Sequence, residues 1–260
     1  MRGRYLFATL KNRLDPRETV DLTLKVRDLV QAGHDRLVGI CPSAAAMAWT
    51  SACKGELAIA AQTCGWTASY SLTGELSVRD LKVFSIAYCI VGHSERRLYL
   101  GETEEIISRR LSALLSASIT PILCVGETPE QRQSKSTVDV VRGQLCSLLA
   151  AFKMSAMEPH PSRTIVAYEP MWAISTAASN LTLKPEDAVA THGAVRRLLD
   201  EIFGSGFGQA TSIIFGGSLN SANAKDFFVH PTIDGGLVGS GMQTVSGFGA
   251  VLDAFYCAKI

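Results

Sequence analysis

The chain alternates between short apolar segments and longer segments with a helical pattern, and it does so eight times. The apolar segments lack strict alternation, which is typical of strands buried on both faces. Strands separated by helices pair in parallel, because each helical crossover returns the chain to the same end of the sheet. The expected strands are 5–9, 37–41, 57–61, 88–91, 120–125, 164–168, 212–215 and 236–238. The expected helices lie near 17–31, 44–53, 78–83, 103–116, 138–153, 185–203, 221–227 and 245–258.

Eight strand–helix units in 260 residues fit a closed (β/α)₈ barrel, whose usual length is about 250 residues. A doubly wound open sheet is the structural alternative. The turn after its first strand normally reads Gly-x-Gly-x-x-Gly, whereas Thr9-Leu10-Lys11-Asn12-Arg13 stands here. No low-complexity tract or linker divides the chain, and the polar stretches 126–137 and 175–184 are expected as loops. The pattern favours one barrel domain over residues 1–260.

The composition limits the partners. With 25 Lys and Arg against 24 Asp and Glu, the formal net charge is +1, so no overall field attracts nucleic acid or an anionic membrane surface. The seven cysteines are scattered without a Cys-x-x-Cys pair, which suits reduced thiols better than disulfides or a zinc site. No apolar segment is long enough to span a bilayer. These features predict a cytoplasmic protein.

Ionisable side chains follow the ends of several expected strands. Lys11 follows the first strand, His93 and Glu95 follow the fourth, Glu127 follows the fifth and Glu169 follows the sixth. In a closed barrel the carboxyl ends of all strands open onto one mouth, where such barrels place their chemistry. A histidine or a glutamate alone is more often structural than catalytic. An imidazole, carboxylates and a lysine around one cavity together indicate a proton-transfer site.

Two glycine-rich turns follow the last two strands. They read Gly216-Gly217-Ser218 and Gly239-Ser240-Gly241. Glycine lets backbone N–H groups approach an anion closely, and the loops after strands seven and eight are the usual phosphate position in this architecture. The alternative is that both are only tight turns before helices.

Five segments resemble the triosephosphate isomerase family in the same order as in that family. They are Gly92-His93-Ser94-Glu95-Arg96-Arg97, 121–128, 167–174, Gly216-Gly217-Ser218 and 234–239. The resemblance implies a single (β/α)₈ TIM barrel and an aldose–ketose isomerase of glycolysis and gluconeogenesis. Such an enzyme interconverts glyceraldehyde 3-phosphate and dihydroxyacetone phosphate through an enediolate. It implies no cofactor, and the five scattered histidines do not suggest a metal site either.

The resemblance also implies catalytic roles. Glu169 would be the base that moves a proton between two neighbouring carbons. His93 would hydrogen-bond the substrate oxygens as a neutral imidazole, and Lys11 would supply a fixed positive charge to the enediolate. Glu95 would either handle protons or form a structural ion pair with Lys11 or Arg96.

A lid and a phosphate site follow from the same resemblance. The lid would comprise Pro170, Met171, Trp172, Ala173, Ile174, Ser175 and Thr176 and would exclude water from the enediolate. Trp172 would be its apolar body, although an ordinary half-buried aromatic is the alternative. Backbone N–H groups of Ser175, Ser218, Gly239 and Ser240 would hold the phosphate. Thr9 would also touch the substrate.

The chain departs from the family pattern around the mouth. Thr9 replaces the usual asparagine, so a long amide donor becomes a short hydroxyl. Ser175 and Ala177 replace lid glycines, Phe215 replaces a tyrosine, and Ser240 replaces the second of two paired glycines. The segment 178–184 is longer than is usual.

These departures leave more than one function open. The alternatives are a paralogue that isomerises a related sugar phosphate, such as a tetrulose phosphate, and a catalytically weak barrel kept as a binding or regulatory protein. Retention of Lys11, His93, Glu95 and Glu169 favours an isomerase of triose phosphates. The Thr73-Gly74-Glu75 turn resembles the family's interdigitating loop and predicts a homodimer.

Overall fold

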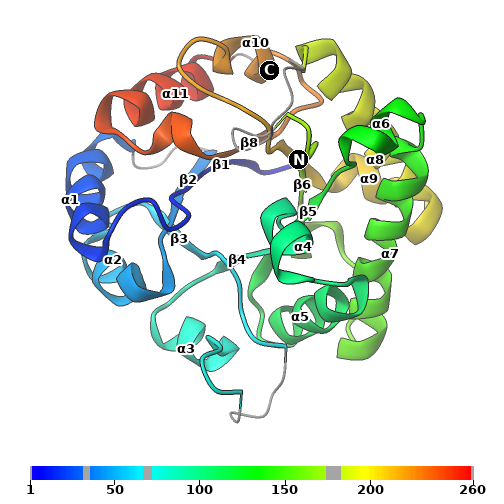
Figure 1. Ribbon diagram of the computed structural model, residues 1–260, viewed down its shortest axis with the longest axis horizontal. Helices are drawn as coiled ribbons and strands as arrows, with labels where there is room; N and C mark the ends of the chain where they lie inside the picture. Colours follow the sequence, from blue (N-terminus) through cyan, green and yellow to red (C-terminus); the bar gives the residue numbers. More distant parts are fainter. Residues whose placement is uncertain (1, 32–35, 67–71, 174–182, 259–260) are drawn as a thin grey trace.

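A computed structural model describes residues 2–31, 36–66, 72–173 and 183–258, and in this part of the chain eight parallel strands close into one barrel (Figure 1). Each strand pairs with the next, and β8 pairs with β1, which excludes the open sheet. The strands are β1 (Arg4–Thr9), β2 (Arg36–Cys41), β3 (Ala58–Ala61), β4 (Tyr88–Val91), β5 (Thr120–Val125), β6 (Ile165–Tyr168), β7 (Ser212–Phe215) and β8 (Gly235–Val238). The (β/α)₈ prediction is confirmed, and each strand end lies within one residue of its expected position.

The helices form a ring outside the strands (Figure 1). They are α1 (Pro16–Val26), α2 (Met47–Cys53), α3 (Val78–Val83), α4 (Ser94–Leu100), α5 (Glu104–Ser116), α6 (Pro129–Gln133), α7 (Thr137–Ser155), α8 (Pro185–Phe203), α9 (Phe207–Ala210), α10 (Ala224–Phe228) and α11 (Val245–Cys257). Short 3₁₀ turns are η1 (Arg27–Leu29), η2 (Ala44–Ala46), η3 (Pro161–Arg163) and η4 (Ser240–Met242). None of the described helices is both long and apolar enough to cross a membrane.

Several expected helix bounds were wrong. The first helix ends at Val26 and continues only as η1, and α10 begins at Ala224. The short helices α4, α6 and α9 were not expected, and α6 lies in a stretch expected to be a loop. α6 begins with a capping box, in which the Thr128 side chain accepts from the Gln131 N–H and Gln131 reaches back, with Pro129 at its first position.

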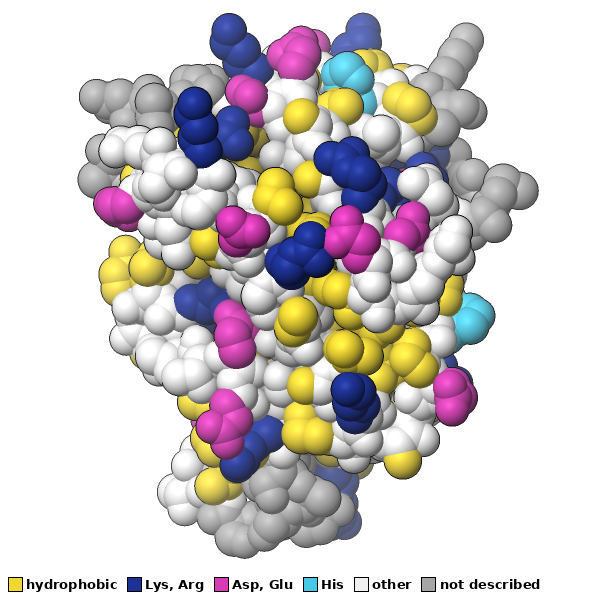
Figure 2. Space-filling view, turned by 90° about the vertical axis from the view of Figure 1, so that its right-hand side faces the viewer, with side chains coloured by type: hydrophobic (Ala, Val, Ile, Leu, Met, Phe, Trp, Pro, Cys, Tyr) yellow, Lys and Arg dark blue, Asp and Glu magenta, His cyan; other side chains and the backbone are white. Residues whose placement is uncertain are grey.

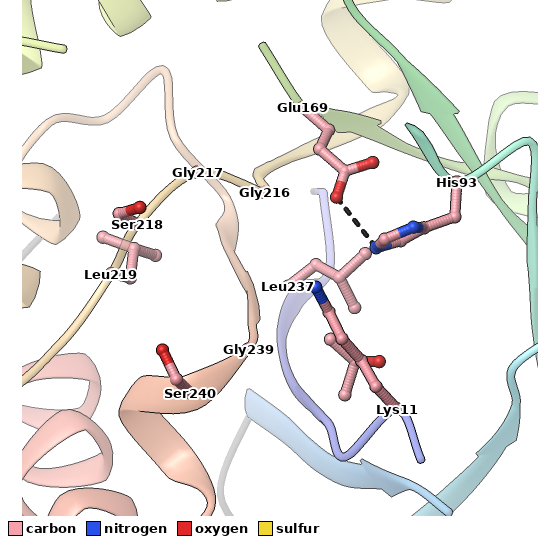
Figure 3. A pocket seen from close by; sticks show the side chains of 11 residues that line it. Lys11, His93, Glu169, Gly216, Gly217, Ser218, Leu219, Leu237, Gly239 and Ser240 are labelled. Atoms are coloured by element: carbon pink, nitrogen blue, oxygen red, sulfur yellow. Dashed lines mark ion pairs between the residues drawn. The ribbon is translucent and has the colours of Figure 1, made fainter. Parts of the chain in front are cut away.

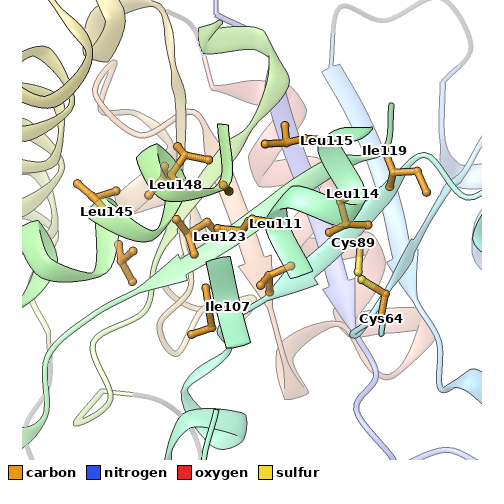
Figure 4. Close-up of a cluster of buried hydrophobic side chains, with 14 of the residues drawn as sticks. Cys64, Cys89, Ile107, Leu111, Leu114, Leu115, Ile119, Leu123, Leu145 and Leu148 are labelled. Carbon is orange, nitrogen blue, oxygen red and sulfur yellow. The ribbon is translucent and has the colours of Figure 1, made fainter. Parts of the chain in front are cut away.

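Side chains inside the barrel form one cluster and those outside it pack under the helices. Phe7, Ile90, Ile122, Ile214 and Leu237 belong to the inner cluster. The outer core includes Leu111 and Leu114 on α5, Leu123 on β5 and Leu145 and Leu148 on α7 (Figure 4). Spacings of three and four residues place these leucines on one face of each helix. Truncating one of them to alanine is expected to cost about 2–5 kcal/mol of stability.

A buried ion pair fixes the end of the barrel opposite the mouth. Arg196 on α8 donates to Asp234 at 2.7 Å, and the same carboxylate oxygen accepts the Ile213 N–H at 2.8 Å. Asp234 therefore joins α8 to β7 just before β8 begins.

Candidate active site

The residues expected at the barrel mouth surround one small cavity (Figure 3). Its walls are Thr9, Lys11, His93, Glu169, Gly216, Gly217, Ser218, Leu219, Leu237, Gly239 and Ser240. They come from the ends of five strands that lie far apart in the sequence. The cavity measures about 20 Å³, which is room for little more than one water molecule.

Glu169 and His93 are in direct contact. The Glu169 Oε1 atom lies 2.9 Å from His93 Nε2, and Oε2 accepts the Ser94 N–H at 2.9 Å. Both side chains are buried. Burial raises the pKa of Glu169, but His93 and the Ser94 N–H outweigh it, so the net pKa shift is downward. The carboxylate is thus held charged in a dry site, as a general base requires.

His93 caps α4, and this contact fixes its tautomer. Its Nδ1 accepts the Glu95 N–H at 3.2 Å, so the ring proton resides on Nε2 and points at Glu169. Burial lowers the pKa of His93, whereas the adjacent Glu169 charge raises it, and the net shift in this resting pair is upward. Protonation of the His93 ring at Nδ1 would break the hydrogen bond that Nδ1 accepts from the Glu95 N–H. Once Glu169 leaves its contact, both burial and the helix terminus favour the neutral ring.

Lys11 reaches the same cavity from a strained turn. Its φ of 52° lies in the left-handed region, which non-glycine residues enter rarely. Gln62 holds this turn by donating to the carbonyls of Lys11 and Cys41, both at 2.9 Å. The ammonium lies 2.6 Å from Glu95 Oε1. Lys11 and Arg96 were the two ion-pair partners expected for Glu95, and the structure shows the ion pair with Lys11.

The wall opposite His93 is formed by the turns after β7 and β8. Gly216 leaves room for the base, because a Cβ there would lie only 3.2 Å from the Glu169 Cβ. Gly239 precedes η4 and lines the cavity together with Ser240, and no side chain caps the first N–H groups of that turn. Uncapped N–H groups at the start of a helical turn are a common feature of anion-binding sites.

Ser218 is engaged differently from expectation. Both its N–H and its hydroxyl donate to the Ala173 carbonyl, at 3.1 and 2.8 Å. In this state the residue ties the start of the expected lid to the loop after β7. Its N–H reaches a phosphate only after that contact breaks.

The start of the expected lid is packed against Glu127. Trp172 is buried and its Nε1 donates to Glu127 at 3.0 Å, and the Tyr168 hydroxyl donates to the same carboxylate at 3.2 Å. The Arg132 guanidinium lies over the Trp172 ring at 5.4 Å. Pro170, Met171 and Ala173 are likewise buried in this segment. The other expected lid residues, Ile174, Ser175 and Thr176, and the departure at Ala177, lie outside the described residues.

Of the departures from the family pattern, Thr9 and Ser240 line the cavity, whereas Phe215 lies in the core. Thr9 is buried at the end of β1 and lines the cavity beside Lys11. Phe215 stacks on Phe227 with ring centroids 4.6 Å apart, and its ring tip occupies the place that a Cβ of Gly217 would take. Phe215 therefore acts as a packing residue.

A second hollow of about 330 Å³ adjoins the first. Both are lined by Thr9, Lys11 and His93, and the second is bounded further out by Tyr99 and Leu100, which are largely exposed. The Thr73-Gly74-Glu75 turn is also exposed, and its Glu75 lies 3.8 Å from Arg110. The adjacent Tyr70 lies outside the described residues.

The remaining charged residues near the mouth are structural. The Arg97 Nε donates to the Gly92 carbonyl at 2.7 Å, and its guanidinium pairs with Glu104. Arg96 pairs with the buried Glu102. The described residues contain no group of three or more His, Cys, Asp or Glu side chains arranged to hold a metal ion.

Comparison with known proteins agrees with this geometry. The family model of triosephosphate isomerase matches residues 5–255. The triosephosphate isomerase of Thermus thermophilus is 43% identical over 180 residues, which are 69% of either chain. That of Bacteroides fragilis is 38% identical over 200 residues, covering 77% of this chain and 76% of the relative. That of Solibacter usitatus is 36% identical over 262 residues, covering 100% and 99%.

Proposed function

The chain belongs to the triosephosphate isomerase family, and on this premise we propose the roles that its own residues play in the reaction. It is an aldose–ketose isomerase that interconverts glyceraldehyde 3-phosphate and dihydroxyacetone phosphate, a step of glycolysis. The observation that carries the proposed roles is the 2.9 Å contact between Glu169 and His93 at the mouth. A buried base and a buried donor that share one hydrogen bond are poised to act on the same small substrate.

Glu169 removes a proton from the carbon next to the substrate carbonyl. The electrons of that C–H bond form a carbon–carbon double bond, and the carbonyl electron pair moves onto oxygen, giving an enediolate. Glu169 then returns the proton to the neighbouring carbon. For this the carboxylate must leave Ser94 and His93, because these two donors occupy both of its oxygens in the resting pair.

His93 and Lys11 stabilise the negative charge on the oxygens. The His93 Nε2–H, released from Glu169, donates to the developing oxyanion, and Nδ1 stays bound to the Glu95 N–H. Lys11 adds a fixed positive charge held by the Gln62-supported turn. Donors fixed before the reaction cost no reorganisation during it, so they lower the barrier more than water does. Glu95 positions Lys11.

The backbone wall binds the phosphate. Gly239 and Ser240 line the cavity and would donate their N–H groups to the phosphate, and Ser218 would join them once it releases Ala173. Ser175 is proposed as a further donor, and Pro170, Met171, Trp172, Ala173, Ile174, Ser175 and Thr176 as the closing lid. Thr9 contacts the substrate beside Lys11. Closure excludes water, which protects the enediolate from losing phosphate.

A coupled assay of the purified protein tests these roles together. Glyceraldehyde 3-phosphate is expected to be converted rapidly, and a tetrulose phosphate only slowly. Faster turnover of the tetrulose phosphate than of the triose would contradict the substrate assignment and favour a paralogue. Binding without turnover of either compound would favour a binding protein.

We further infer a homodimer. The hollow of about 330 Å³ beside Lys11 has exposed apolar residues, Tyr99 and Leu100, at its rim. The exposed Thr73-Gly74-Glu75 turn is proposed to fill this hollow in a second copy, and a two-fold axis makes both contacts at once. Light scattering is expected to give twice the chain mass of 27.9 kDa. A monomer mass at assay concentrations would overturn this proposal.

The cytoplasm is the proposed location. All seven cysteines are free thiols, which is usual where the compartment is reducing. Fractionation of the source cells tests this, and activity confined to another fraction would contradict it.

A further inference from the structure

A cleft of about 250 Å³ lies on the outer surface between α7 and α8, away from the barrel mouth. This side of the molecule faces the viewer in Figure 2, where apolar side chains lie among Lys, Arg, Asp and Glu. The cleft is lined by Arg132, Thr137, Val138, Val141, Asp187, Ala190, Thr191, Ala194, Val195, Arg197 and Leu198. The isomerase reaction assigns no role to this cleft.

Small side chains create the cleft. Ala190 and Ala194 lie one turn apart on α8 and leave space opposite Val138 and Val141 of α7. The floor is dry and apolar, since Val141, Val195 and Leu198 are almost fully buried. An apolar cavity of about 150 Å³ can hold benzene, so about 250 Å³ has room for such a ring and a short arm.

The rim carries positive charge. Arg132 and Arg197 contribute two guanidiniums against one carboxylate, Asp187, and only Arg132 is paired with it, at 3.2 Å. Arg197 has no ion-pair partner among the described residues. Thr137, at the first position of the 19-residue α7, also lines the rim, and no side chain caps this helix. The rim therefore favours an anionic group above the apolar floor.

We propose that this cleft binds a small amphipathic carboxylate. Its apolar body lies between Val138 and Ala194, and its carboxylate pairs with Arg197 and competes with Asp187 for Arg132. A guanidinium matches the planar, two-oxygen shape of a carboxylate, as the existing Arg132 contact with Asp187 illustrates.

The cleft shares two side chains with the region under the lid. Arg132 contacts the Trp172 ring and lies 3.9 Å from Glu127, which in turn binds Trp172. The Thr191 hydroxyl, which donates to the Asp187 carbonyl at 3.1 Å, also lies beside Tyr168, the residue before the base. A ligand that draws Arg132 toward the cleft weakens its hold on Trp172. The site itself is independent of the proposed function, but this effect on turnover rests on it.

Titration with phenylacetate, followed by ligand-observed NMR, tests the site directly. Saturable binding is expected with a dissociation constant of about 1 mM, typical for a ligand of this size. Phenylacetamide, which keeps the ring but lacks the charge, should bind at least about 5-fold more weakly. Ala194→Leu fills the cleft and should abolish binding, and Arg197→Gln should weaken it about 3-fold.

Arg142→Gln is the matched control, because Arg142 pairs with Glu201 across the same two helices but does not line the cleft. It should leave binding unchanged. Equal binding by wild type and Ala194→Leu would overturn the proposal, as would the absence of saturable binding to wild type.

Steady-state kinetics test the coupling separately. Phenylacetate should lower kcat in wild type and should have no such effect on Ala194→Leu, which retains basal activity. Purely competitive inhibition in both proteins would place the ligand at the phosphate wall and contradict the proposal. Saturation of the cleft without a change in kcat would refute the coupling.

Discussion

The two sides of the active-site cavity are built in different ways. On one side, Lys11, His93 and Glu169 face the cavity with side chains whose positions are fixed by Gln62 and by the N–H groups of α4. On the other, the turns after β7 and β8 face it mainly with backbone. We call the first the side-chain wall and the second the backbone wall.

This difference determines what each wall tolerates. A proton can be moved only by a side chain with the right pKa, so the side-chain wall depends on residue type. An N–H group is supplied by every residue except proline, so the backbone wall depends on backbone geometry. The chain fits this rule at Lys11, His93 and Glu169 and at the serine of position 240, whereas Thr9 beside Lys11 is a departure on the side-chain wall.

The largest effect is expected from Glu169→Gln. The amide has nearly the same shape but cannot accept a carbon-bound proton, so kcat should fall by at least about 10²-fold while the fold is retained. Assays of the variant against Glu186→Gln, an exposed glutamate on α8, provide the control. Turnover of Glu169→Gln at the wild-type rate would remove Glu169 as the base.

Thr9→Asn should improve the side-chain wall. It adds an amide donor beside Lys11, and one hydrogen bond to a charged intermediate is worth about 1.5–3 kcal/mol. The value of kcat/KM for triose phosphate should therefore rise by about one to two decades. Parallel assays with a tetrulose phosphate show whether the substitution raises the rate of the best substrate or only increases the preference for triose over tetrulose. A fall in both rates would mean that Thr9 is coadapted with its neighbours Phe215 and Ser240.

Two substitutions at Ser240 probe the backbone wall. Ser240→Pro removes the N–H, and proline fits the first position of η4, so KM should rise about tenfold without loss of fold. Ser240→Gly keeps the N–H and removes only the side chain, so KM should stay within about 3-fold. Equal increases in KM for the two variants would mean that the serine side chain, rather than its backbone, binds the phosphate.

A smaller effect is expected away from both walls, at the buried His192 of α8. Burial lowers the pKa of His192 to about 3, and its ring packs against Tyr168 of β6 and Phe215 of β7. Below its unfolded pKa of about 6.5, the unfolded chain binds a proton that the folded chain excludes, so stability falls with decreasing pH by up to about 1.4 kcal/mol per unit.

His192→Asn removes this titration while keeping a donor for the Thr232 carbonyl. Urea unfolding between pH 6.5 and 4 should therefore give the variant a flatter pH dependence than wild type. Parallel curves would show that His192 is protonated in the folded state.

The contrast between the walls also explains what the sequence could predict. Strands buried on both faces are continuous apolar runs, so their positions followed from the pattern alone, and the number of units favoured a closed barrel over an open sheet. The polar residues after β1, β4 and β6 were found because parallel strands end at one mouth. The capping box at Thr128 was present in the sequence and would have revealed α6.

Other features depend on contacts between distant segments. The Ser94 N–H binds a carboxylate 75 positions further on, and no local pattern specifies that distance. The role of Glu127 as the partner of Trp172 and Tyr168 was missed for the same reason, although its place after β5 was noted. The small size of the cavity depends on side-chain positions that only the folded chain defines.

Isomerisation of glyceraldehyde 3-phosphate in D₂O, followed by proton NMR, tests the central claim most directly. If Glu169 carries the proton between two carbons, the wild-type protein should form dihydroxyacetone phosphate. Part of this product should contain solvent deuterium on the carbon to which Glu169 returns the proton. Glu169→Gln should give neither product nor exchange on the same time scale. Absence of isomerisation by the wild-type protein, or product formation by Glu169→Gln at the wild-type rate, would contradict the account.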